Sequence, residues 1–190
     1  MQQQSRSPLA PWRRFLWLAA VVAASVAFSL GLACAVPIAA FAAVAALTLS
    51  RQDALVLIVA VWLANQLVGF VVLDYPWTAN TFAWGVALGA VAVLTTGAGQ
   101  WTVGRSMSTC RAVGYMATFL VAFAVYEATL FVISATLLGG TEIYTAAIQG
   151  WIFAVNGAAF VGLLVLHLLA VSVGFAVTPA VGPSMTESHA

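Results

Sequence analysis

Long apolar runs separated by short polar stretches dominate the chain between residues 13 and 177. A helix needs about 20 apolar residues to cross roughly 30 Å of hydrocarbon, and backbone groups there must be satisfied within the segment. The second run is short and begins after Pro37, a residue that suits a first helical turn. The pattern predicts six membrane-spanning helices, over residues 13–34, 36–50, 53–73, 82–103, 112–138 and 146–177.

Composition supports the same fold class. The chain is 64% hydrophobic and only 6% charged, whereas a soluble domain of 190 residues needs a charged shell. We therefore expect an all-α integral membrane protein whose surroundings are membrane lipid. The chain has no lysine, no basic patch and no nucleic-acid motif, so we expect no nucleic-acid partner.

The arginines predict the orientation of the bundle. With six spans, all of them fall on one side, which the positive-inside rule identifies as the cytoplasm. Both termini are then cytoplasmic, and short tails at 1–12 and 178–190, the latter disordered, flank one six-helix domain at 13–177. We expect a multi-pass protein of a bacterial-type cytoplasmic (inner) membrane. The arginines are Arg6, Arg13, Arg14, Arg51, Arg105 and Arg111.

The remaining reactive side chains do not form a catalytic set. Cys34 and Cys110 fall at opposite membrane faces and cannot pair. His167 lies about 16 Å along the sixth helix from Asn156, and a haem ligand, a proton relay or a packed neutral imidazole all fit it. No nucleophile–base set, metal-ligand spacing or phosphate loop is present. We therefore expect neither an enzyme nor a cofactor.

Four polar side chains from three predicted helices are expected to share one layer just outside the bilayer midplane. They are Asn65, Gln66, Glu127 and Asn156, with Tyr126 at similar depth. A charged carboxylate there costs on the order of 3 kcal/mol, so we expect Glu127 to be neutral and hydrogen-bonded to one of the amides. Asn65 and Gln66 are adjacent, so at most one is expected to face a given cavity. The layer either binds a solute or holds the helices together.

The predicted outer loop "DYPWTANT", from Asp74 to Thr81, combines an acid, aromatic rings and hydroxyl or amide groups. Such a loop suits the cap of a pocket, but Tyr75-Pro76 is also an ordinary turn sequence, and Trp77 is suited to anchoring at the interface. The candidate solute-binding residues are Glu127, Asn65, Gln66, Asn156, Tyr126, Asp74, Tyr75 and Trp77.

The segment "VPIAAFAAVAALTLSRQDALVLIVAVWLANQLVGF", from Val36 to Phe70, contains a short alanine-rich helix after a proline, followed by a helix that ends in amides. With six spans and polar groups under outer loops, the chain resembles the substrate-binding S components of energy-coupling-factor vitamin transporters. The alanine pairs of the first helix, such as Ala19 with Ala23, are similar to the surface by which S components meet their transmembrane partner. The resemblance implies capture of a vitamin-like solute from outside, with separate transmembrane and ATPase subunits.

Three functions remain open on the sequence. The first is a substrate-binding component for uptake of a small vitamin-like solute. The second is a small autonomous proton-linked transporter that uses Glu127. The third is a structural or assembly subunit of a larger membrane complex, in which Glu127 bonds within the bundle or to a partner helix.

Overall fold

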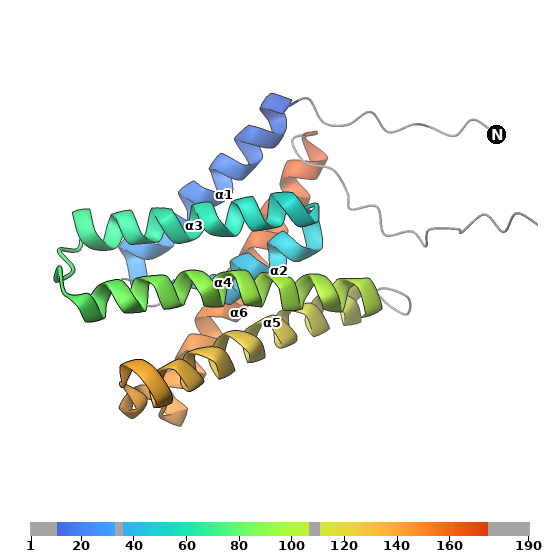
Figure 1. The fold of residues 1–190 in the computed structure, drawn as a ribbon. Helices are drawn as coiled ribbons and strands as arrows, with labels where there is room; N and C mark the ends of the chain where they lie inside the picture. The colour runs from blue at the N-terminus through green and yellow to red at the C-terminus, as the bar shows by residue number, and fades with distance from the viewer. Residues whose placement is uncertain (1–10, 33–35, 107–110, 175–190) are drawn as a thin grey trace, which may run out of the picture.

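The computed structural model describes residues 11–32, 36–106 and 111–174, and this part of the chain is helical, with no strand (Figure 1). A π-helical turn and a 3₁₀ turn connect the fifth and sixth helices. The elements are α1 (Pro11–Leu32), α2 (Ile38–Thr48), α3 (Arg51–Val71), α4 (Ala79–Ser106), α5 (Arg111–Ile133), η1 (Ser134–Leu138), η2 (Thr141–Ile143) and α6 (Ala146–Ser172).

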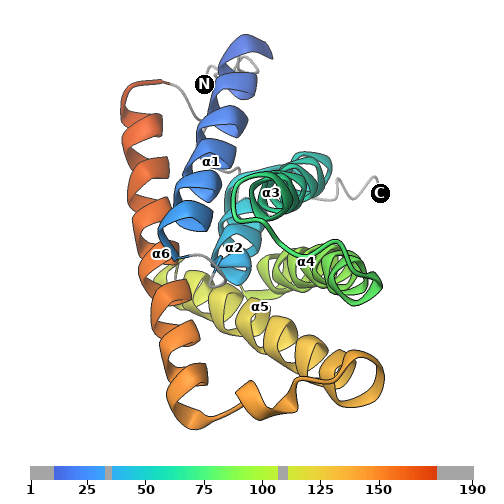
Figure 2. The same cartoon turned by 90° about the vertical axis from the view of Figure 1, so that its left-hand side faces the viewer.

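The short helix α2 forms the centre of the bundle (Figure 2). Every residue from Ile38 to Leu47 is buried, and α2 packs against α3, α4, α5 and α6. Its alanines allow this close approach, because small side chains let helix backbones come near one another. With 11 residues, α2 is only about 16 Å long.

The longer helices surround α2. α1 packs against α3, α3 against α4, and α4 against α5, so that α4 lies between α3 and α5 (Figure 1). Their outward faces carry exposed apolar side chains, among them Leu67, Val86 and Leu168. An apolar surface of this extent suits contact with lipid rather than water.

Four helical segments are long and apolar enough to cross a membrane, which indicates a membrane protein. In the described part of the chain, the shorter apolar helices are Phe15–Gly31, within α1, and Ile38–Thr48. The four longer segments are Arg51–Val71, Ala79–Arg105, Arg111–Leu138 and Ala146–Ser172.

Several predicted helix boundaries are corrected by one to three residues: α2 is shorter than the predicted 36–50, and α3 is shifted from 53–73 to Arg51–Val71. The last five residues of the predicted 112–138 form the π-helical turn η1. α4 begins at Ala79, three residues before the predicted residue 82, because the Thr78 hydroxyl accepts a hydrogen bond from the Thr81 amide at 3.2 Å and caps the helix. α1 begins at Pro11, inside the segment predicted as a tail. Cys34, Cys110 and the predicted C-terminal tail lie outside the described residues.

Candidate functional site

A cavity of about 240 Å³ lies between the C-terminal part of α3 and the N-terminal part of α4. The loop that joins these helices contributes to its wall, and so does the residue before Pro37. Its volume holds about eight water-sized groups. The lining residues are Val36, Asn65, Gln66, Tyr75, Thr81, Trp84, Gly85 and Leu88.

Both amides of α3 face this one cavity, and the prediction that at most one would do so is wrong. The Ser29 hydroxyl of α1 lies 3.3 Å from the Asn65 Oδ1 atom and 3.0 Å from the Ser25 carbonyl, and its single hydrogen is donated to one of these acceptors at a time. Gln66 points to the other side, toward α4, where a Cβ added to Gly85 would lie 2.6 Å from its Oε1 atom. The cavity therefore curves around α3 widely enough to include two adjacent residues.

The amides retain hydrogen-bonding capacity. Within the described residues, the Gln66 side chain and the Asn65 Nδ2 group make no hydrogen bond to protein, and neither does the Trp84 indole. Because Gly85 has no side chain, Gln66 can lie directly against the backbone of α4. The cavity thus combines mostly apolar walls with a few polar groups, as small-molecule sites do.

The loop between α3 and α4 turns back over the cavity. The Tyr75 amide donates to the Gly69 carbonyl at 3.0 Å, and a Cβ on Gly69 would lie 2.7 Å from two carbons of the Tyr75 ring. Asp74 has a φ of 51°, a left-handed conformation that is uncommon for a residue other than glycine. This turn directs Tyr75 toward α3 and into the cavity wall.

The other two predicted loop residues, Asp74 and Trp77, do not line the cavity. The side chain of Trp77 is 74% exposed and contacts the rings of Phe70 and Phe82, with centroids 5.2 and 5.7 Å away. Phe70 and Phe82 stack at 5.0 Å. These rings join the ends of α3 and α4 beside the cavity, so Trp77 has a packing role there.

Five lining residues were missed by the sequence reasoning: Val36, and four residues of α4, which are Thr81, Trp84, Gly85 and Leu88. Thr81, Trp84 and Leu88 follow the spacing i, i+3, i+7, which puts them on one face of a helix. Trp84 and Leu88 already fall within the predicted helix 82–103, and a start at Ala79 would have added Thr81 to the same face.

Glu127 is not bonded to the amides, and that prediction is wrong. Its Oε1 atom is buried and has no hydrogen-bond partner in the described part of the chain. Its neighbour is instead Tyr144, just after η2. Burial raises the pKa of the Tyr144 hydroxyl above its ordinary value, and the nearby charge of Glu127 raises that pKa further. The predicted polar layer is therefore not one contiguous group of side chains, because depth in the bundle does not determine which way a side chain faces.

Asn156 has a structural position at the start of α2. Its Oδ1 accepts a hydrogen bond from the Ala40 amide at 3.2 Å, and its Nδ2 donates to the Ile152 carbonyl at 3.0 Å. Ala40 lies in the first turn of α2, where amides have no partner within the helix, and Pro37 provides no side-chain cap. Asn156 therefore caps α2 from α6. Neither it nor buried Tyr126 lines the cavity.

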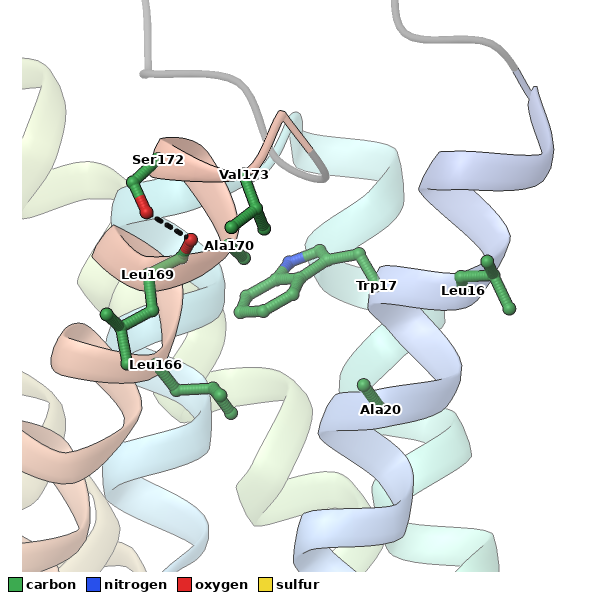
Figure 3. Close-up of a pocket in the computed structure, with 8 residues that line it drawn as sticks. All are labelled: Leu16, Trp17, Ala20, Leu166, Leu169, Ala170, Ser172 and Val173. Carbon is green, nitrogen blue, oxygen red and sulfur yellow. Dashed lines mark hydrogen bonds between the residues drawn. The ribbon is translucent and has the colours of Figure 1, made fainter.

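At the other end of the bundle, α1 and α6 form an apolar groove of about 400 Å³ (Figure 3). Trp17 reaches across from α1, and Leu166 and Leu169 are on the opposite wall. The Trp17 ring contacts buried His167 edge-on at 5.4 Å, and both His167 nitrogens lack a partner among the described residues. No group of three or more metal-ligating side chains occurs in that part of the chain.

In comparisons with known proteins, this chain matches no family model, no curated protein and no solved structure. The candidate site therefore rests on the geometry of the cavity.

Proposed function

We propose that this protein is a solute-binding component of a bacterial-type inner membrane, and that the cavity between α3 and α4 is its binding site. The observation that carries the proposal is the pair of amides, Asn65 and Gln66, which line one cavity with hydrogen-bonding groups unused. These amides are only partly buried, and their free groups are not among the fully buried unpaired atoms of the described residues. Water can therefore bond them in the empty cavity, and a solute that replaces this water must offer equivalent hydrogen bonds.

The proposed site opens to the outside of the cell. Arg51 begins α3, and by the rise of a helix it lies about 21 Å from Asn65. Arg105 lies in the last turn of α4, at the end remote from Thr81. The positive-inside rule assigns the arginine end to the cytoplasm. In this proposal the chain has six spans, and both termini are cytoplasmic.

The resemblance to S components extends the proposal from binding to uptake of a small vitamin-like solute. The chain has no phosphate-binding motif, so energy would come from a separate ATPase subunit coupled to a transmembrane partner. The exposed small residues of α1, including Ala19 and Ala23, are the candidate contact surface. Co-purification of a protein partner without any bound solute would favour an assembly subunit instead.

Native mass spectrometry of gently extracted protein tests the proposal. We expect a small-molecule adduct that is lost in Gln66→Leu, which keeps the approximate volume and removes the amide, and retained in Glu127→Gln. The matched control is Gln149→Leu, which removes an amide of α6 that does not line the cavity. Loss of the adduct in Glu127→Gln but not in Gln66→Leu would refute the cavity as the site.

One observation favours a second candidate, a small proton-linked transporter. Glu127 has a buried oxygen without a partner in the described residues, and its charge acts on the Tyr144 hydroxyl. The helix that carries Glu127, α5, continues into the π-helical turn Ser134–Leu138. Such turns are frequent at functional sites, and carboxylates within membrane spans serve as proton relays. In that case, liposomes with this chain alone would show pH-dependent uptake, abolished by Glu127→Gln.

A further inference from the structure

We infer that the solute is a neutral single-ring heterocycle that carries both hydrogen-bond donors and acceptors on its edge. This inference rests on the proposed function of the cavity between α3 and α4. The charge, the size and the functional groups of the cavity wall each restrict the ligand independently.

The uncharged wall disfavours ions. None of the described side chains that line the cavity is charged. Asp74, the nearest acid along the chain, is exposed on the loop and does not line it. A carboxylate or ammonium group in such a site would be removed from water without a partner of opposite charge, at a large cost in affinity.

The size of the cavity restricts the ligand to about one ring. The volume of about 240 Å³ corresponds to about eight water-sized groups. A substituted five- or six-membered ring fills this space. A nucleotide or a fused tricyclic cofactor would extend out of the cavity, which is partly open.

The polar groups match the edge of a heterocycle. Three of the lining residues have side chains that form hydrogen bonds: Asn65 and Gln66 each carry an amide donor and acceptor, and Trp84 carries an indole donor. Side-chain amides pair with ring nitrogens and exocyclic amino groups, as Asn and Gln do with adenine. A hydrophobic ring would leave these groups unpaired on binding.

The remaining walls suit a flat ring. Tyr75 and Trp84 are aromatic, and Val36 and Leu88 are aliphatic. Flat ligands stack on aromatic side chains in offset or edge-on arrangements. The contact of Tyr75 with Gly69 holds the Tyr75 ring in the wall before a ligand arrives, which reduces the ordering cost of binding. A sugar, with hydroxyls around its whole ring, would face apolar groups on several sides.

Four probes test the ligand class on the full chain in lipid nanodiscs: nicotinamide, nicotinate, uracil and glucose. Nicotinamide and nicotinate have the same ring, but nicotinamide carries a neutral amide and nicotinate carries a carboxylate. We expect nicotinamide or uracil to raise the thermal unfolding midpoint and to bind at least tenfold more tightly than nicotinate and glucose. We expect Gln66→Leu to weaken that binding at least tenfold and Gln149→Leu to leave it unchanged.

The outcomes separate the ligand class from the proposed function. If nicotinate or glucose binds as tightly as the neutral rings in a Gln66-dependent way, the ligand class is wrong and the cavity remains a solute site. If neither neutral ring binds, the ligand class is also overturned. The native mass spectrometry experiment then tests the proposed function. An adduct that is lost in Gln66→Leu would support a solute-binding function, and the absence of any adduct would contradict it.

Discussion

Replacing Asn156 with alanine tests whether this buried amide caps α2 or contacts the solute. The substitution removes the oxygen that accepts the hydrogen bond of the Ala40 amide at 3.2 Å. Asn156 is 1% exposed, so water cannot replace it without entering the core. A buried donor left unpaired costs about 1–3 kcal/mol, and we expect a loss of that size in the free energy of unfolding.

The assay is reversible unfolding in detergent micelles or bicelles, followed by circular dichroism. A change of even 1 or 2 kcal/mol alters the ratio of folded to unfolded protein by a factor of about 5–30, which such titrations resolve. The matched control is Asn80→Ala, which removes an exposed amide in the first turn of α4 and should leave stability unchanged within about 0.5 kcal/mol.

A second measurement separates capping from binding. Under conditions where Asn156→Ala is fully folded, solute affinity should equal that of the wild type, because Asn156 does not line the cavity. A stability loss below about 0.5 kcal/mol, the range of ordinary surface substitutions, would refute the capping argument. A tenfold loss of affinity in the folded variant would restore Asn156 as a solute ligand.

Three further predictions concern the loop, the tyrosine beside η2 and the buried acid. Gly69→Ala places a Cβ 2.7 Å from the ring of Tyr75, and we expect solute affinity to fall about tenfold. The control Gly97→Ala, whose added Cβ meets nothing within 4 Å, should leave affinity unchanged. Equal affinities of the two variants would contradict a role for Tyr75. Because the native pKa of Tyr144 is raised above 10.0 by burial and by the charge of Glu127, native protein holds this proton more tightly than unfolded protein. Stability should therefore fall as pH rises above about 10, and Tyr144→Phe should reduce that fall in alkaline unfolding titrations. Glu127→Gln should keep the fold and solute affinity in the same assays, because the Glu127 carboxyl does not line the cavity; unfolding of this variant would show that the carboxyl is structurally required.

Helix positions were largely predictable from the sequence. The five longer helices follow apolar runs, because a segment buried in hydrocarbon must be both apolar and helical. The start of α4 was misplaced because its first turn, Ala79-Asn80-Thr81, is not strongly apolar, and its helical state depends on the Thr78 cap. Hydropathy alone carries no information about such a cap.

The site was predictable only in part. The sequence identified three lining residues, Asn65, Gln66 and Tyr75, because amides in an apolar helix and an aromatic loop are unusual. It also grouped Glu127 and Asn156 with them, since residue number gives depth along a helix. Depth does not tell which helices are neighbours. With α4 between α3 and α5 (Figure 1), Glu127 has other neighbours than the amides.

The cap on α2 has a consequence for biosynthesis. Asn156 is translated 116 residues after Ala40, a delay of about 6–23 s at the usual 5–20 residues per second. During that interval the start of the central helix lacks its partner. α2, about 16 Å long, is too short to be held in a bilayer of roughly 30 Å by hydrophobic length alone. The nascent chain must therefore keep α2 in a provisional position until α6 leaves the ribosome, so the core is completed only after α6 has been made.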